Sequence, residues 1–392
     1  MIDVERARAE TPGCEHVLHL NNAGSSLPAR PVLEATIGHL ELEARIGGYE
    51  AHEQNEAAIE RFYDATAALI GAERREIAFC SSATRAWDMA FYAFDFHHGD
   101  RILTSVADYI SNYIAYIQTA ERTGVEIVTV PNDEDGQVSV DALRDLADER
   151  VKLIAITHVP TNGGLVNPVA EIGPFARDAG IPYLVDACQS AGQIPLDVDE
   201  IGCDALSATG RKYLRGPRGS GFLYVRSELL ERLVPTFLDM RAAEWTAPDR
   251  FELRQDGRRF EEWEQDYAAK AGLARAIDYA LGWGIDQIWD RVRGLGERLR
   301  TRLAEVDGVT LRDAGALRCG IVTFDVDAVP AEEVKRTLAR DRINVTVSAT
   351  SSAVIDSLER GLPDLVRASV HYFNTDEELD RAVESVRIAA RC

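Results

Sequence analysis

The sequence contains few cysteines, and none of them is placed to hold a metal or to pair with a near neighbour. No Cys-x-x-Cys pair and no zinc-type spacing occurs in the 392 residues. The six cysteines are Cys14, Cys80, Cys188, Cys203, Cys319 and Cys392. Scattered cysteines in a chain of this size are typical of a reducing compartment, so we expect a cytoplasmic protein without a metal site.

Long apolar stretches are also missing. The first residues are charged and contain no apolar core of a signal peptide. No apolar run elsewhere is long enough to span a bilayer. No internal repeat or low-complexity segment stands out. We therefore expect neither secretion nor membrane insertion.

Positive charge is scarce. Asp and Glu number 65 against 43 Lys and Arg, which gives a formal net charge of −22. Nucleic acids and anionic membranes attract basic surfaces, so neither is expected as a partner. The apolar fraction of 46% is typical of soluble globular proteins, and the length predicts two domains with a large core. A small basic pocket for an anionic ligand remains compatible with this composition.

One glycine-rich segment, residues 207–221, contains the lysine Lys212. Its glycines allow the backbone to approach a ligand closely. The Thr209 hydroxyl and the Arg211 guanidinium stand beside the lysine, and such a loop could cradle a phosphate. The segment lacks the glycine spacing of a Walker loop. Taken alone, it could equally be a basic surface turn.

An acid and an amide follow the apolar segment 181–185, at Asp186 and Gln189. In open α/β sheets, ligands bind beyond the carboxyl ends of the strands. An aspartate there could hold a pyridinium nitrogen, and a lysine could bind the aldehyde of pyridoxal phosphate (PLP) as a Schiff base. The order and spacing of Asp186, Gln189 and Lys212 resemble the class V aminotransferase family, which includes cysteine desulfurases and isopenicillin N epimerase. The resemblance covers nearly the whole chain.

The resemblance implies the PLP-dependent fold type I, an α/β architecture in which a large domain has a mostly parallel seven-stranded sheet and a smaller C-terminal domain is α+β. Strand and helix patterns alternate along much of the chain, which also predicts a mostly parallel sheet. We expect residues 1–30 to join the small domain and the active site, residues 31–265 to form the PLP-binding domain, and residues 266–392 to form the small domain. Residues 237–264 show little periodicity and are predicted to form a long crossing loop.

A turn between a predicted strand and a helix begins at Ser81. The free N–H groups of a helix N-terminus suit a phosphate. Ser81 or Ser82 could instead serve only as a helix cap. The resemblance implies that Ala83 and Thr84 bind the cofactor phosphate. Arg211 stands where most cysteine desulfurases have histidine, and a guanidinium can still bind the phosphate.

The resemblance assigns further residues to the cofactor ring and its chemistry. It implies that Tyr109 stacks on the ring, that Asp186 pairs with the ring N–H, and that Gln189 donates to the phenolic oxygen. It makes Lys212 the Schiff-base lysine and proton shuttle, and it places His158 near the cofactor. A partly desolvated lysine near positive charge has a lowered pKa, which suits a base. As single residues, Tyr109 and His158 could also be ordinary core side chains.

The substrate side is assigned to the N-terminal segment and to two later positions. Asn22, Ala23 and Gly24 resemble a backbone clamp that closes over the substrate. Asn162 is predicted to contact the substrate as well. Arg367 stands in an Arg-Ala-Ser motif, and the resemblance implies that it grips the substrate α-carboxylate by a bidentate pair. A surface ion-pair arginine is the alternative interpretation of Arg367.

Two further residues, besides Arg211, depart from the pattern of the family. Cysteine desulfurases carry a nucleophilic cysteine on a loop of the small domain, and Ser351 occupies about that position here. A hydroxyl is a far poorer acceptor of sulfane sulfur than a thiolate, so persulfide transfer is not expected. Glu264 stands where a family threonine reaches the cofactor phosphate of the partner subunit. The resemblance still implies a homodimer, with residues 259–263 as the crossing segment.

We expect an enzyme that acts on an amino acid with a leaving group on its side chain. The motif around Lys212 is similar to the branch that includes isopenicillin N epimerase and the C–S lyases of ergothioneine biosynthesis. The first hypothesis is therefore a C–S lyase that converts a cysteine conjugate or sulfoxide to pyruvate and ammonia. An epimerase or racemase with Tyr109, His158 or His371 as the second acid/base is the main alternative. A cysteine desulfurase, an aminotransferase and a PLP-binding protein without catalysis are less favoured.

Overall fold

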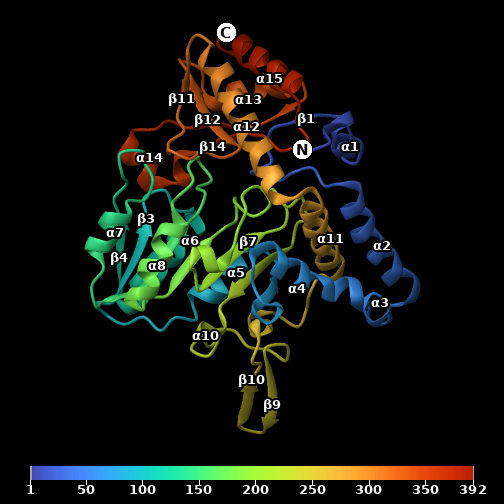
Figure 1. Cartoon of the computed structure of the whole chain (residues 1–392), viewed down its shortest axis with the longest axis vertical. Helices are drawn as coiled ribbons and strands as arrows, with labels where there is room; N and C mark the ends of the chain where they lie inside the picture. Colours follow the sequence, from blue (N-terminus) through green and yellow to red (C-terminus); the bar gives the residue numbers. More distant parts are fainter. Residues whose placement is uncertain (1, 392) are drawn as a thin grey trace.

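The computed structural model of the chain describes residues 2–391, which contain a seven-stranded sheet, a smaller four-stranded sheet and two two-stranded sheets (Figure 1). The seven strands of the large sheet, in spatial order, are β2 (Ile77–Cys80), β8 (Gly221–Val225), β7 (Ala205–Thr209), β6 (Tyr183–Asp186), β5 (Val151–Thr157), β3 (Arg101–Ser105) and β4 (Glu126–Val130). Strand β8 runs antiparallel to both of its neighbours, and the other pairs are parallel. The predicted mostly parallel seven-stranded sheet is therefore confirmed.

Helices cover both faces of this sheet, which explains why its central strands are buried along their whole length. One face packs against α5 (Ala83–Phe91) and α6 (Ile110–Thr123). The helices on the other face are α4 (Glu56–Ile70), α7 (Val140–Leu146), α8 (Val169–Ala179), α9 (Val198–Ile201) and α11 (Tyr267–Trp283). The alternation of strands and helices in the sequence reflects this layered arrangement.

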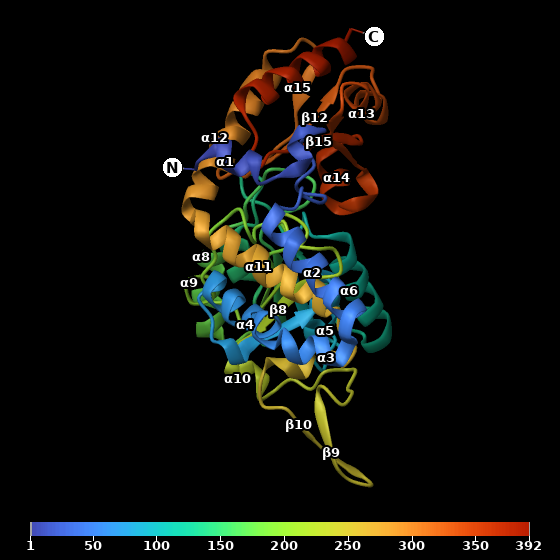
Figure 2. The same ribbon diagram turned by 90° about the vertical axis from the view of Figure 1, so that its right-hand side faces the viewer.

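The small sheet is antiparallel and is formed by the C-terminal part of the chain. Its strands, in spatial order, are β11 (Val309–Leu311), β12 (Ile321–Val326), β15 (Leu365–Ser369) and β14 (Thr346–Ser348). The helices that pack on it and on one another are α12 (Ile285–Ala304), α13 (Ala331–Arg340) and α15 (Asp376–Ala389), as seen in Figure 2. No helix within residues 2–391 has the length and apolar character that a membrane crossing requires.

The N-terminal segment reaches the small sheet before it enters the large one. Strand β1 (Leu18–His19) pairs in parallel with β13 (Ile343–Asn344), and the N–H of Ala23 donates to Ser369 Oγ (2.9 Å). Helix α2 (Arg30–Ile46) then packs along α11, which also packs on α4. The division of the chain at residues 30 and 265 stays a prediction.

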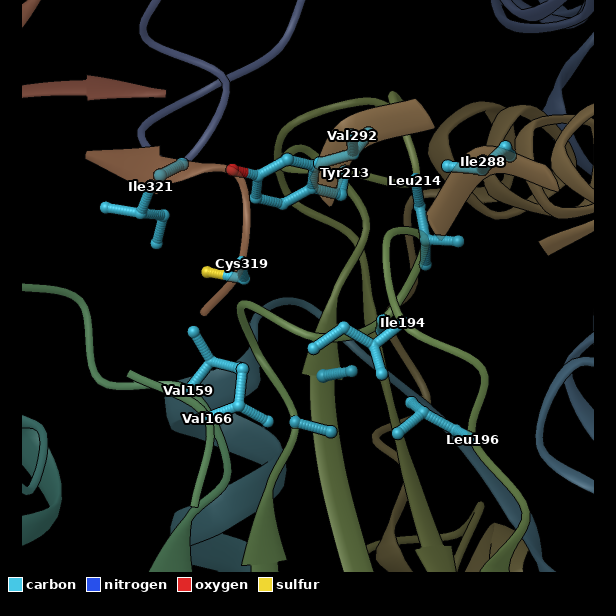
Figure 3. Close-up of a cluster of buried hydrophobic side chains, with 14 of the residues drawn as sticks. Val159, Val166, Ile194, Leu196, Tyr213, Leu214, Ile288, Val292, Cys319 and Ile321 are labelled. Carbon is cyan, nitrogen blue, oxygen red and sulfur yellow. The ribbon is translucent and has the colours of Figure 1, made fainter. Parts of the chain in front are cut away.

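The large and small sheets share one continuous hydrophobic core. Figure 3 shows the part of it that includes Tyr213 and Leu214 from the glycine-rich segment. Ile288 and Val292 of α12 and Cys319, just before β12, belong to the same cluster. Burial of this cluster ties the glycine-rich segment to the C-terminal part of the chain.

Residues 243–253 form a β-hairpin inside the predicted crossing loop. Its strands β9 (Ala243–Ala247) and β10 (Arg250–Leu253) are antiparallel, and they project from the large-sheet part of the molecule (Figures 1 and 2). The prediction of a loop without regular structure is therefore wrong for this stretch. The sequence shows no alternation here because both faces of the hairpin are largely exposed.

Candidate active site

A cavity of about 230 Å³ lies at the carboxyl ends of the parallel strands, next to the N-terminus of α5. Strands β6 and β7 end there, and the glycine-rich segment follows β7. The cavity is lined by Ser81, Ser82, Ala83, Thr84, Tyr109, Asn112, Asp186, Cys188, Thr209, Arg211, Lys212, Arg218 and Gly219. The structure thus brings the predicted cofactor ligands together, with the exception of Gln189.

Lys212 is buried at the wall of this cavity, with its Nζ 3.2 Å from the Sγ of Cys188. Burial, together with the nearby charge of Arg211, lowers the pKa of the Lys212 amine. A lowered pKa leaves more of the amine unprotonated at neutral pH, and the unprotonated form attacks an aldehyde. The surroundings of Lys212 therefore suit the predicted Schiff base.

Arg215 holds the segment that carries Lys212. It is buried and has a left-handed φ of 64°. Its guanidinium donates to the Leu27 backbone oxygen (2.8 Å), the Tyr372 hydroxyl (2.6 Å) and the Thr11 hydroxyl (2.5 Å). These acceptors come from both ends of the chain, so the N-terminal and C-terminal parts together fix the position of the lysine.

Asp186 is buried at the cavity, and each of its oxygens has a donor. Oδ1 accepts the N–H of Cys188 (2.8 Å), and Oδ2 accepts Nδ2 of Asn112 (3.0 Å). Each oxygen keeps a lone pair that can accept the N–H of a pyridinium ring. Burial raises the pKa of Asp186, and the two hydrogen bonds and the charge of Lys212 oppose the rise. A cationic ring nitrogen would balance the charge of this carboxylate.

The N-terminus of α5 forms another wall of the cavity. Ser82 caps the helix, because its Oγ accepts the N–H of Arg85 (3.0 Å). The N–H groups of Ala83 and Thr84 have no intrahelical acceptor and remain for an anion. Arg211 also lines the cavity and has a buried Nη1 without a hydrogen-bond partner. These donors fit the phosphate of PLP, as the lysine and the aspartate fit its aldehyde and its ring nitrogen.

Arg367 lies against Thr161 and forms no ion pair within the described residues. Its Nη1 donates to the backbone oxygen (2.9 Å) and to Oγ1 (2.7 Å) of Thr161, and its Nε is buried without a partner. Burial lowers the pKa of Arg367 to about 10, so the guanidinium stays charged at neutral pH. The alternative of a surface ion-pair arginine is wrong, because the side chain is buried. A buried cation with a free donor suits a substrate carboxylate.

Gln189 contacts the same Thr161 hydroxyl as Arg367 does. Its Nε2 donates to the backbone oxygen of Ala23 (3.1 Å), next to Gly24, and to Thr161 Oγ1 (3.0 Å). Both amide hydrogens are thereby used, and the free atom is the buried acceptor Oε1. The predicted bond from Gln189 to the phenolic oxygen requires that the amide release one of these two acceptors.

The structure does not bring His158 to the cofactor cavity. The preceding Thr157 donates to Asp108 on the cofactor side, and side chains alternate along a strand, so His158 faces the other way. It lines a separate cavity of about 690 Å³ together with Asn167 and Leu317. Burial lowers the pKa of His158 to about 4, which makes the ring neutral at pH 7. Its catalytic role stays a prediction without support from this geometry.

Two predicted substrate ligands have side chains that are bonded inside the protein. Asn22 Nδ2 donates to the backbone oxygen of Ser369 (2.7 Å), and its Oδ1 accepts the hydroxyl of Ser26 (2.7 Å). Asn162 Oδ1 accepts the hydroxyl of Ser348 (2.6 Å). Both side chains connect loops near the cavity with the small sheet. A contact of either residue with the substrate stays a prediction.

Sequence reasoning missed four residues near the cavity: Thr161, Asn112, Cys188 and Asp108. Asp108 precedes helix α6, which begins at Ile110, and the turn into the helix brings its side chain to Asn112. Cys188 adjoins the predicted Gln189, but a buried cysteine is more often a packing residue, so it was not predicted to belong to the site. Thr161 carries no local signal, because its partner Arg367 lies 206 residues further along the chain.

Ser351 is exposed in the 3-10 turn Thr350–Ser352, which precedes α14 (Val354–Arg360). No cysteine occurs in this part of the sequence. The five described cysteines are all unpaired, and Cys188 is the one that lines the cofactor cavity. Cys392 lies outside the described residues. The turn that resembles the desulfurase loop therefore presents a hydroxyl and no thiol.

Comparisons with known proteins find relatives of the whole chain. The model of the family described as aminotransferase class-V matches residues 18–382. A protein of Synechocystis sp. named "probable cysteine desulfurase" is 29% identical over 385 residues, 96% of this chain and 91% of that protein. The apo structure of cysteine desulfurase from Thermococcus onnurineus matches with a TM-score of 0.91 at 26% identity, over 100% of this chain and 99% of that one. A third match is the structure of the cystine C–S lyase C-DES with its reaction product cysteine persulfide. Its TM-score is 0.86 at 24% identity, over 96% of this chain and 99% of that one, and at this identity the match shows the fold alone.

Proposed function

The chain belongs to the class V aminotransferase family and is a PLP-dependent enzyme, and from this premise we propose that it is a lyase which breaks the C–S bond of a cysteine conjugate or cysteine sulfoxide. The products would be pyruvate, ammonia and the sulfur-bearing leaving group. The proposal depends on one contrast. The buried Lys212 and Arg367 supply a base and a carboxylate-binding group for an amino-acid substrate. Ser351, in the turn that resembles the desulfurase loop, supplies no thiol to accept sulfur.

Asp186 and the phosphate-binding groups orient the cofactor in this proposal. When bound, PLP supplies an aldehyde that captures the substrate amine and a ring that withdraws electrons from Cα. Asp186 would hold the proton on the ring nitrogen, since Cys188 and Asn112 fix its two oxygens. The amides at the start of α5 and the Arg211 guanidinium would bind the phosphate.

Lys212 Nζ acts as the base. Its pKa is lowered by burial, so the amine can take the proton from the substrate Cα. Arg367 binds the α-carboxylate and so orients the Cα–H bond. The electron pair of that bond forms the Cα=Cβ bond while the Cβ–S bond breaks and its electron pair leaves with the sulfur, which takes up a proton. Water converts the released enamine to pyruvate and ammonia.

An epimerase is the second candidate, because the phenol of Tyr109 lines the cavity and could serve as a second acid/base. His371 is less suited to that role. Its ring is buried, its Nε2 lies 3.0 Å from the backbone oxygen of Tyr213, and burial holds its pKa well below the usual range. The names of the relatives favour a desulfurase as a third candidate, and Ser351 speaks against it.

A product assay separates the candidates. The holoenzyme is incubated in deuterated water with cysteine, cysteine conjugates, cysteine sulfoxides and ordinary amino acids. Pyruvate from a conjugate or a sulfoxide supports the lyase. Deuterium at Cα with inversion indicates an epimerase. Alanine together with sulfane sulfur from cysteine indicates a desulfurase, and that result would contradict the proposal.

A variant without cysteines is expected to keep the cofactor and to turn over at a rate close to that of the parent enzyme, because the proposed chemistry needs no protein thiol. Pyruvate release measures the rate. Cys188→Ala alone is the matched control, since the Sγ of Cys188 contacts Lys212 Nζ. If the cysteine-free protein binds cofactor but has lost all turnover while Cys188→Ala is active, a persulfide mechanism on another cysteine replaces the lyase.

A cytoplasmic location without nucleic-acid or membrane partners is also proposed. The five described cysteines are unpaired, as in a reducing compartment. The net charge of −22 disfavours polyanionic partners.

The protein is expected to form a homodimer through the hairpin β9–β10. Trp245 and Phe251 on this hairpin are 78% and 54% exposed, and Trp263 on the crossing segment is exposed as well. Large apolar side chains that gather on a protruding element are typical of an interaction surface. Arg259 is buried and donates to the backbone oxygen of Leu230 (2.6 Å) in its own chain. The hairpin and Trp263, and not Arg259, would therefore face the second copy.

Sedimentation tests this surface. The parent protein is expected to sediment as a dimer at micromolar concentration, and the double variant Trp245→Ser, Phe251→Ser as a monomer. Leu358→Ser removes an equally exposed apolar side chain from α14, away from the hairpin, and should leave the dimer intact. A parent protein that is monomeric and fully active would contradict the prediction.

A further inference from the structure

A second buried carboxyl group, Asp108, lies near the candidate ligand of the ring nitrogen and has no part in the mechanism above. It is 5% exposed and follows β3. Its partners Thr104 and Thr157 stand near the carboxyl ends of β3 and β5. The next strand in the sheet, β6, ends at Asp186. Asp108 and Asp186 therefore occupy neighbouring positions along the same edge of the sheet.

Five donors surround the Asp108 carboxyl group. They are Tyr109 N–H (2.6 Å), Asn112 Nδ2 (3.3 Å) and Thr157 Oγ1 on Oδ1, and Thr104 Oγ1 (2.6 Å) and Tyr116 OH (3.0 Å) on Oδ2. Burial and, to a lesser degree, the charge of Asp186 raise the pKa of Asp108, and the two threonine hydroxyls lower it. Because all five partners donate, they stabilise the ionised form of the group. These hydrogen bonds oppose the effect of burial, which on balance raises the pKa of Asp108.

Asn112 connects the two carboxylates. Its Nδ2 lies 3.3 Å from Asp108 Oδ1 and 3.0 Å from Asp186 Oδ2. The amide nitrogen carries two hydrogens, so each carboxylate receives one. Rotation of this amide would leave a buried carboxylate short of a donor, which is unfavourable. Asp108 therefore fixes the amide of Asn112, and the amide fixes Asp186.

We propose that Asp108 is a positioning residue that acts on the cofactor ring through Asn112 and Asp186. It keeps Asp186 in the orientation that accepts a ring N–H, and its ionised form adds a second negative charge near that nitrogen. Two buried carboxylates favour a cationic ring over a ring that cannot be protonated. The inference rests on the proposed role of Asp186, and it is independent of which amino acid the enzyme cleaves.

The test compares the affinities of the full-length protein for PLP and for its 1-deaza analogue, in which a C–H group replaces the ring nitrogen. Equilibrium dialysis of each ligand gives the ratio of the two dissociation constants. The parent protein is expected to prefer PLP, and Asp186→Ala to lose the preference. Asp108→Asn is nearly isosteric but removes the charge, and it is expected to reduce the preference about tenfold, as a change of about one pKa unit at the ring nitrogen would.

Two further variants complete the test. Asn112→Ala removes the amide that connects the two carboxylates but leaves Asp108 in place. It is expected to reduce the preference for PLP over the 1-deaza analogue as well. Tyr113→Phe is the matched control on the same helix, because the Tyr113 hydroxyl lies against Thr129 (3.3 Å) and touches neither carboxylate. Its preference should equal that of the parent.

Two results would overturn the inference. If Asp108→Asn and Asn112→Ala weaken both ligands equally and leave the preference unchanged, Asp108 is merely structural. If Asp186→Ala keeps the preference, the role of Asp186 itself fails and the inference falls with it. The two failures are distinguishable, because only the second involves the Asp186 variant.

Discussion

Replacement of Lys212 by alanine is expected to abolish the covalent attachment of PLP to the protein. Lys212 is the one lysine that lines the cofactor cavity, and burial lowers the pKa of its amine. Loss of the proton transfer alone should reduce turnover by about 10²–10⁴-fold. Borohydride reduction of the holoenzyme, followed by mass spectrometry of its peptides, measures the attachment. The four lysines of the sequence are Lys152, Lys212, Lys270 and Lys335, so the labelled position can be assigned directly.

Lys270 is the competing site, because it is also buried and its pKa is lowered to about 8 by burial. Its Nζ donates to the Tyr63 hydroxyl (2.6 Å) and to Gln265 Oε1 (2.9 Å), outside the cofactor cavity. We therefore expect no label on Lys270. The exposed Lys152→Ala is the matched control and should retain the adduct. An unchanged adduct in Lys212→Ala would remove Lys212 from its assigned role.

Replacement of Arg367 by alanine should lower kcat/KM by about a hundredfold or more, because losing one buried charge-assisted pair costs about 2–5 kcal/mol. The absorption spectrum of the bound cofactor should stay unchanged, since Arg367 is not among the residues that line the cofactor cavity. Steady-state kinetics with the best substrate of the product assay, together with the spectrum, measure both effects. The buried and unpartnered Nε of Arg367 is the physical reason for the large effect.

Three comparisons make this result specific. Arg367→Lys keeps the charge but lacks the planar fork, so it should recover only part of the activity. Conversion of the substrate α-carboxylate to an amide should impair the parent enzyme strongly and Arg367→Ala little. Arg318→Ala removes a partly exposed arginine that is paired with Glu297, and it should behave as the parent does. If Arg367→Ala keeps normal kcat/KM, another group binds the carboxylate.

The sequence by itself determined the features that depend on local order. Hydrophobic periodicity and helix caps predict where strands end and helices begin. Parallel strands all end at one edge of their sheet, so residues at the ends of β6 and β7 and at the start of α5 must meet there. Asp186, Lys212 and the turn at Ser82 could therefore be placed at one cavity before the fold was known. The absence of a thiol near Ser351 is likewise a property of the sequence alone.

The tertiary structure alone decided which distant side chains touch. Arg367 donates to Thr161 across 206 residues, and Asn112 reaches Asp186 across 74. Periodicity indicates that a side chain is buried, but the partner depends on how the small sheet packs on the large one. Alternation along β5 indicates that Thr157 and His158 point to opposite faces. Only the hydrogen bond from Thr157 to Asp108 shows which of the two faces the cofactor cavity. The hairpin β9–β10 could not be predicted for a different reason: most of its side chains are exposed, so no buried face imposes an apolar alternation on its sequence.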